Sequence, residues 1–239
     1  MSYSITKWFS DIVRYPQKTI TRDQGSYEEY WDLRGRSGPV SISAWQKERA
    51  DILLARIRSD GTTTPVVLDV GSGNGAVLSY LKKNIPGLKG IGVDLSDEIL
   101  APVKEAGFET LVLNCALPSE RRFPECDYVV LFEVIEHIAD AEALVESALR
   151  VARKGVCISI PNSGFFTYRL RLLFGKFPAQ WARTPNEHLR FWTLADMHWW
   201  LGALDWKGSV STYQGVPFLK NVWPALFAAG MVVWIPRKP

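Results

Sequence analysis

The chain has 239 residues and a mass of 27.0 kDa, with 47% hydrophobic and 22% charged residues. This balance is typical of a folded globular protein and excludes a long disordered or fibrous chain. The formal net charge of 28 − 25 = +3 is too small an excess to indicate a nucleic-acid partner. The three cysteines form no CxxC pair, which suits a reducing compartment better than a disulfide framework.

Neither end of the sequence predicts export or membrane insertion. The first ten residues lack the apolar run of a signal peptide. The longest uncharged stretch, residues 221–235, contains Pro224 and Gly230 and is shorter than the roughly 20 residues that span a bilayer. We therefore expect a cytoplasmic protein without a transmembrane segment.

Residues 1–60 predict a helical lead-in to the main domain. Between residues 43 and 57, apolar side chains recur on one side of a helix among charged ones. Four residues nearer the N-terminus are candidates for surface packing or for closing over a cofactor: Tyr27, Tyr30, Trp31 and Arg34.

From residue 65 onward, short apolar runs alternate with helical patterns. We expect strands at 66–70, 90–94, 110–113, 128–132 and 156–160. We expect helices at 76–83, 97–106, 141–153 and 194–201. Such alternation implies a parallel sheet covered on both faces. The predicted fold class is α/β, with an open, doubly wound, mostly parallel, Rossmann-like sheet in residues 61–239 and a single domain overall.

The most informative segment is 66–75, VVLDVGSGNG, in which a predicted strand runs into glycines and then into a helix. Glycines at 71, 73 and 75 allow a tight turn and a close approach of the backbone to a ligand. Asp94 ends the next predicted strand, 94 − 75 = 19 residues after the last glycine. This spacing is close to the roughly 20 residues typical of an acidic residue that binds ribose hydroxyls. Together the two features predict a nucleoside ligand.

The loop sequence also bears on which nucleoside binds. A dinucleotide fingerprint reads GxGxxG and leaves the helix N-terminus open for a pyrophosphate. Here the pattern is Asp69-x-Gly71-x-Gly73-x-Gly75, and the loop contains no Lys or Arg. Because a carboxylate attracts a cation and repels a diphosphate, this loop favours a cationic ligand over NAD.

The motif resembles that of class I S-adenosylmethionine (SAM)-dependent methyltransferases, whose sheet usually has seven strands. The resemblance implies that Asp69 helps to hold the ammonium group of SAM and that Asp94 binds its ribose. Asn114 and Cys115 match the adenine-side position, where an Asp is commoner. The full cofactor-binding set that the resemblance implies is Asp69, Gly71, Ser72, Gly73, Gly75, Asp94, Leu95, Asn114, Cys115 and Phe132.

The segment 132–138, FEVIEHI, follows the fourth predicted strand. If it turns helical, Glu133, Glu136 and His137 share one face at spacings i, i+3 and i+4. These side chains could bind neighbouring loops structurally. Alternatively, His137 could be a general base for a hydroxyl nucleophile, with His188 as the second choice. In a third interpretation a divalent metal ion such as Mg, Mn, Fe or Zn binds to Glu133, Glu136, His137 and His188.

The Glu-x-x-Glu-His turn resembles the metal-binding motif of small-RNA 2′-O-methyltransferases and the equivalent turn of ubiquinone-biosynthesis O-methyltransferases. Both resemblances are confined to the turn. The short chain and its modest charge disfavour an RNA substrate. The metal interpretation therefore stays open beside the other two.

Residues 162–190 interrupt the alternation and predict a lid, because an insertion here lies above the carboxyl ends of the strands, where open α/β sheets bind ligands. Its aromatic residues either pack in the core, with Arg169 and Arg171 solvated, or shape an acceptor pocket whose arginines bind an anion. A third interpretation is a peripheral membrane contact that presents a lipid-linked acceptor.

The insertion and the tail resemble the MetW proteins of bacterial methionine metabolism. The similar segments are 160–175, 180–181, 184–189 and 222–227, so that with the glycine loop the similarity covers most of residues 65–235. MetW acts with a homoserine acyltransferase and has an apolar and polar sequence in place of the turn at 133–137. This chain instead carries acid and imidazole groups there, which suit catalysis.

We expect a SAM-dependent methyltransferase that moves a methyl group to a hydroxyl or carboxyl oxygen of a small molecule, sugar or lipid-linked glycan. Methyl transfer is an in-line displacement, and holding the reacting atoms in line can supply roughly 7–11 kcal/mol. The alternative from another class is a non-catalytic, MetW-like module that binds and regulates a homoserine acyltransferase. A NAD-dependent oxidoreductase is the weaker enzyme alternative.

Overall fold

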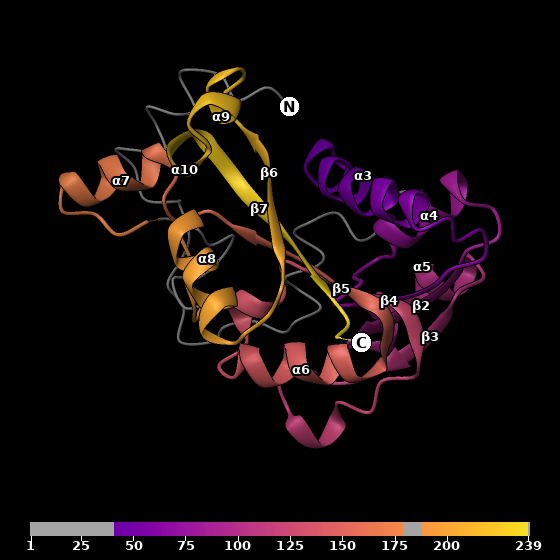
Figure 1. Ribbon diagram of the computed structural model, residues 1–239. Helices are drawn as coiled ribbons and strands as arrows, with labels where there is room; N and C mark the ends of the chain where they lie inside the picture. The colour runs from indigo at the N-terminus through magenta and orange to yellow at the C-terminus, as the bar shows by residue number, and fades with distance from the viewer. Residues whose placement is uncertain (1–40, 179–187, 239) are drawn as a thin grey trace.

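The structure is a computed structural model that describes residues 41–178 and 188–238. Its strands form one seven-stranded sheet in the order β3-β2-β1-β4-β5-β7-β6 (Figure 1). The strands are β1 Val66–Val70, β2 Lys89–Asp94, β3 Glu109–Val112, β4 Cys126–Phe132, β5 Ala152–Pro161, β6 Ser209–Gly215 and β7 Ala228–Pro236. Within the described ranges, β7 is the one strand that runs antiparallel to its neighbours, β5 and β6. The predicted α/β class with a mostly parallel sheet is confirmed.

The helices connect the strands and extend beyond them. They are α3 Ala44–Ser59, α4 Ala76–Asn84, α5 Asp97–Glu105, α6 Ala141–Val151, α7 Phe166–Leu173, α8 Leu194–Ala203, α9 Leu219–Val222 and α10 Pro224–Phe227. Two short 3-10 turns, η1 Pro118–Glu120 and η2 Ile135–His137, flank β4. The strands and helices predicted between residues 65 and 201 are therefore confirmed, with boundaries shifted by a few residues.

Helices cover both faces of the sheet, because its central strands are apolar on both sides. On one face α3 and α4 pack through Leu53 and Leu78 against strand residues that include Val130. On the other face α6 and α8 contribute Leu144 and Trp200 to a second core. In Figure 1 α3 and α4 lie to the right of the long strands β6 and β7, and α6 lies below. Both layers leave the carboxyl ends of the parallel strands free to carry loops.

Helix α3 confirms the helix predicted at 43–57. It begins with a capping box in which Ser43 Oγ accepts a hydrogen bond from the Gln46 amide, and Gln46 Oε1 accepts one from the Ser43 amide. The apolar face of α3 lies against α4 and the sheet, and it buries Arg49 together with Leu53 and Ile57. The other lead-in candidates, Tyr27 to Arg34, lie outside the described residues.

The insertion predicted at 162–190 contains α7, and its residues 179–187 lie outside the described part of the chain. The centroid of the Phe166 ring lies 5.8 Å from that of the Phe227 ring in α10. Arg171 is only 1% exposed and donates through Nε to the Phe177 carbonyl, so the expectation that it is solvated is wrong. Across the two described ranges, no helix has the length and apolar character needed to cross a membrane.

Candidate active site

The glycine loop lies at the carboxyl end of β1. The amides of Gly71 and Ser72 both donate to the Val93 carbonyl of β2, at 2.8 and 3.0 Å. Gly71, Gly73 and Gly75 have φ values of 75°, 53° and 76°, a left-handed conformation that glycine adopts without the penalty of a Cβ atom. The loop therefore needs these glycines for its shape, as the sequence predicts.

The loop packs directly against the turn that follows β4. A Cβ atom added at Gly71 would lie 2.6 Å from Val134 Cγ2, well inside van der Waals contact. Val134 immediately precedes the short helix η2, which carries Glu136 and His137. The two motifs that the sequence singled out, the glycine loop and the acidic turn, are thus neighbours in space.

Asp94 ends β2 and is 3% exposed. Its Oδ2 accepts a hydrogen bond from the Gly73 amide, and its Oδ1 accepts one from the Leu95 amide, both at 2.8 Å. The carboxylate thus holds the glycine loop to the end of β2. Each carboxylate oxygen has two lone pairs, so the same side chain can also accept hydrogen bonds from ribose hydroxyls.

Asp69 lies in β1 and is 2% exposed. Its Oδ2 has no hydrogen-bond partner among the described residues. Burial raises the pKa of Asp69 to about 7, an effect that Arg49 opposes and Asp94 reinforces. A buried carboxyl with an unused oxygen beside a glycine loop is suited to receive a cationic group of a ligand.

The predicted adenine-side residues follow β3. The Asn114 amide donates to Glu120 Oε2 at 2.7 Å, and Asn114 Oδ1 accepts from the Ala116 amide at 3.0 Å, which closes a tight turn. Cys115 lies beside this turn, and burial raises the pKa of its thiol to about 11. Leu95 is exposed at the end of β2. Leu95 therefore offers an apolar side chain at the edge of the predicted cofactor site.

Glu133 follows β4 and has φ = 58°, so the chain is not helical at this residue. Its Oε1 accepts hydrogen bonds from Ser159 Oγ and Tyr213 OH, both at 3.0 Å, and lies 3.2 Å from Arg49 Nη1. The Arg49 guanidinium also lies over the Phe132 ring, 5.1 Å from its centroid. The helical face expected to join Glu133 with Glu136 and His137 does not form, because Glu133 turns toward this arginine.

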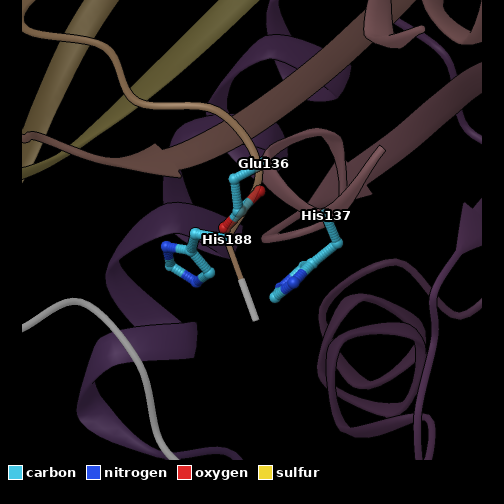
Figure 2. Close-up of side chains that lie close together, drawn as sticks. All are labelled: Glu136, His137 and His188. Carbon is cyan, nitrogen blue, oxygen red and sulfur yellow. The ribbon is translucent and has the colours of Figure 1, made fainter. Parts of the chain in front are cut away.

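A second cluster comprises Glu136, His137 and His188. Each side chain offers one ligand atom, and these atoms all lie within 4.8 Å of one another. The imidazole rings of His137 and His188 meet edge to face, with centroids 4.7 Å apart. Figure 2 shows the Glu136 carboxylate directed toward His188, with His137 beside them. The structure thus brings together three of the four residues in the sequence hypothesis and places Glu133 in another network.

Glu136 has an unusual environment within this cluster. It is 1% exposed, and neither carboxylate oxygen has a hydrogen-bond partner among the described residues. Burial and the neighbouring Glu133 raise the pKa of Glu136 well above its ordinary value, while Arg49 opposes the shift. Because an unpaired buried carboxylate is costly, this group needs a proton, a ligand or a cation.

His188 reaches the cluster from the far end of the insertion. The Glu136 carbonyl accepts hydrogen bonds from the amides of Leu189 and Arg190, at 2.8 and 3.2 Å. Arg190 in turn pairs through Nη1 with both carboxylate oxygens of Glu142 on α6, at 2.6 and 2.7 Å. These contacts fix residues 188–190 against η2.

Residues 42–208 match a family model described as a methyltransferase domain, which is more than half of the chain. The chain belongs to the class I SAM-dependent methyltransferases. Its strand order, with one antiparallel strand between β5 and β6, agrees with this membership.

Sequence relatives of this methyltransferase domain are distant. It is 25% identical over 152 residues to a ubiquinone biosynthesis O-methyltransferase from Methylococcus capsulatus. The match covers 59% of this chain and 63% of the relative, so the chain spans less than two thirds of that protein's length.

Solved structures share the fold. A magnesium protoporphyrin IX methyltransferase from Synechocystis PCC 6803 with bound SAH has a TM-score of 0.62 and 16% identity, over 91% of this chain and 98% of that one. The methyltransferase domain of the bacterial protein CtHen1 has a TM-score of 0.56 and 21% identity, over 79% and 96%. At these identities the likeness concerns the fold alone.

The candidate site also contains residues that the sequence analysis did not select. Arg49, Ser159 and Tyr213 come from α3, β5 and β6 and meet at Glu133. The signal for Arg49 was its place on the otherwise apolar face of α3, where an arginine needs a buried partner. Tyr213 and Ser159 carried no comparable signal, because β6 was not predicted and buried serines are common in strands.

Proposed function

We propose that this protein transfers the methyl group of SAM to a hydroxyl or carboxyl oxygen of a small acceptor. The observation that carries the proposal is the close packing of the glycine loop on the turn that bears Glu136 and His137, since a Cβ atom added at Gly71 would lie 2.6 Å from Val134 Cγ2. A cofactor on the loop and an acceptor beside the turn would then meet across a short distance.

On the cofactor side, Asp69 would receive the ammonium group of SAM and Asp94 its ribose hydroxyls. Gly71, Ser72, Gly73 and Gly75 would line the methionine part, and Leu95, Asn114, Cys115 and Phe132 would complete the site. The buried Nε of Arg49 has no hydrogen-bond partner among the described residues, so it is a candidate donor to the carboxylate of SAM.

On the acceptor side, the reaction needs a proton removed from the acceptor hydroxyl. It also needs the acceptor oxygen, the methyl carbon and the sulfur held in line. The acceptor oxygen attacks the methyl carbon, the carbon–sulfur bond breaks with its electron pair going to sulfur, and SAH leaves. The hydroxyl proton would pass to the imidazole of His137, with His188 as the second candidate base. Because SAM already carries an activated methyl group, alignment would supply much of the acceleration.

The acceptor class in this proposal is a small molecule, a sugar or a lipid-linked glycan. The ubiquinone relative supports oxygen as the methylated atom, since its name describes an O-methyltransferase. The relation to MetW, an acyltransferase partner, contact with a membrane surface and a cytoplasmic location remain sequence predictions.

Calorimetric titration of the purified protein with SAM, and separately with NAD, tests the proposal. We expect saturable binding of SAM with one site per chain and no heat from NAD. Absence of SAM binding would overturn the proposal and would favour the non-catalytic alternative. Where SAM binds, His137→Ala should leave its affinity unchanged and slow transfer of labelled methyl groups by about 10²–10⁴-fold.

A further inference from the structure

The cluster of Glu136, His137 and His188 has the composition of a metal site with three protein ligands. Two imidazoles and one carboxylate form a mixed nitrogen and oxygen set, which suits first-row transition metals better than Mg²⁺. The chain has three histidines in all, and two of them lie in this cluster while His198 is exposed on α8. The two histidines of the cluster, His137 and His188, are far apart in the sequence and are brought together by the fold.

The spacing of the ligand atoms fits a bound ion after small side-chain movements. The three atoms lie within 4.8 Å of one another. Ions with ligand bonds of about 2.0–2.2 Å hold neighbouring ligand atoms about 3 to 3.5 Å apart, so rotations that move each atom by about 1 to 2 Å would complete the site. His137 and His188 are half-buried, which leaves them room for such rotations.

The buried carboxylate supplies an independent reason to place a cation here. Both oxygens of Glu136 are shielded from solvent and lack hydrogen-bond partners among the described residues. The carboxylate is directed toward His188, and His137 lies beside the pair (Figure 2). A divalent cation would satisfy this group, whereas Arg49 is already held by Glu133 and Ser159.

We propose that Glu136, His137 and His188 bind one divalent transition-metal ion, of the class of Zn²⁺ or Mn²⁺, and that Glu133 is not a ligand. The inference rests on the proposed function and deepens it: an acceptor oxygen would occupy an open coordination position. The ion would supply Lewis acidity that lowers the pKa of the acceptor hydroxyl. With an ion bound, His137 and His188 would be ligands, so solvent water would accept the hydroxyl proton in place of the imidazoles named above as candidate bases.

The backbone supports this assignment. Two hydrogen bonds, from the amides of Leu189 and Arg190 to the Glu136 carbonyl, hold the segment next to His188 against the turn that carries His137. The Arg190 to Glu142 pair and the bond from Trp200 Nε1 to Glu142 Oε1, at 2.7 Å, brace the same segment. Ligands held on a braced frame lose little conformational freedom when an ion binds.

The test measures metal binding directly in the full-length protein. After dialysis against a chelator, the protein is titrated by calorimetry with Zn²⁺, Mn²⁺ and Mg²⁺, and Co²⁺ is added as an absorption probe. We expect one ion per chain, with Zn²⁺ or Mn²⁺ preferred to Mg²⁺. No saturable binding, or a preference for Mg²⁺, would overturn the assignment.

Matched variants then identify the ligands. Glu136→Gln and His188→Ala should weaken Zn²⁺ binding by more than about 100-fold, the upper end of the loss caused by removing a mere supporting group. His198→Ala should bind Zn²⁺ within about threefold of the wild type, and Glu133→Gln should lose less than about tenfold, because it removes a neighbouring charge but no ligand. Wild-type affinity in Glu136→Gln or His188→Ala overturns the site, and an equal loss in Glu133→Gln overturns the three-ligand set.

The same metal-free protein separates this inference from the proposed function. SAM titration should give the same affinity with and without the ion, since the cofactor groups lie on the glycine loop and β2. If SAM binds and full methyl transfer persists without metal, the catalytic role of the ion is refuted and the proposed function stands. If SAM does not bind in either form, the proposed function itself fails.

Discussion

Arg49 Nη1 lies 3.2 Å from Glu133 Oε1, and this ion pair joins the helix before the sheet to the loop after β4. Tyr213 and Ser159 donate to the same carboxylate oxygen. The pair thereby fixes the position of Glu133 beside the cluster of Glu136, His137 and His188 without placing it in that cluster.

Replacing Arg49 alone should destabilise the fold more than replacing Arg49 and Glu133 together. Arg49→Met leaves the Glu133 carboxylate without its cation, and breaking a largely buried pair costs about 3 kcal/mol. The double variant Arg49→Met with Glu133→Gln should recover part of this loss. Urea unfolding of the single and double variants measures the coupling, and strictly additive losses would show that the pair contributes nothing.

Asp94→Asn should weaken SAM binding by about 10- to 100-fold, because hydrogen bonds to a charged group contribute roughly 1.5–3 kcal/mol. Asn keeps one oxygen for the Gly73 amide and loses only the bond from the Leu95 amide, so the loop should hold its shape. Asp97→Asn is the matched control, since Asp97 is an exposed residue on α5 that pairs with Lys104. Calorimetry gives both affinities, and equal affinity in Asp94→Asn would remove Asp94 from the ribose site.

Asp69 should make SAM binding pH-dependent. The pKa of its carboxyl is about 7 in the folded chain, above the ordinary value of 3.8, because the group is buried. A cationic ligand prefers the ionised carboxylate. The affinity for SAM should therefore increase by up to about tenfold for each unit by which pH rises toward 7. Titrations between about pH 5.5 and 7 test this, and Asp69→Asn should abolish the part of the slope that belongs to this group.

The same shift predicts the opposite trend for the stability of the ligand-free protein. Between the unfolded pKa of 3.8 and the folded value near 7, the folded chain retains a proton that the unfolded chain has lost. The contribution of Asp69 to the free energy of unfolding is therefore fully present below 3.8 and is lost as pH rises through 7. Denaturation of the wild type and Asp69→Asn across this range isolates it.

Gly71→Ala should cost more stability than Gly107→Ala. Both glycines have left-handed φ values, 75° and 81°, so both substitutions carry a conformational cost of about 1 kcal/mol. A Cβ at Gly107 meets nothing within 4 Å, whereas one at Gly71 lies 2.6 Å from Val134. The clash should add at least about 1 kcal/mol.

A compensating substitution checks the cause of that difference. Val134→Ala combined with Gly71→Ala removes the atom that the new Cβ would strike. The extra loss should disappear in thermal or urea unfolding of the double variant. If it persists, the contact between the glycine loop and the turn at Val134 is not its source.

The sequence by itself determined the fold class and the conformation of the glycine loop. Strand 66–70, the three glycines and Asp94 are local features, since hydrophobic periodicity and left-handed glycine positions depend on neighbours along the chain. The structure confirms the sheet and the loop geometry that these residues predict.

The tertiary structure alone decided how the acidic turn is used. Spacing suggested that Glu133 and Glu136 share a face, but Glu133 adopts φ = 58° and pairs with Arg49 from a helix before the sheet. His188 reaches Glu136 because backbone hydrogen bonds from Leu189 and Arg190 dock the end of the insertion on η2. Such partners are chosen by long-range packing and charge balance, which no local pattern in the sequence encodes.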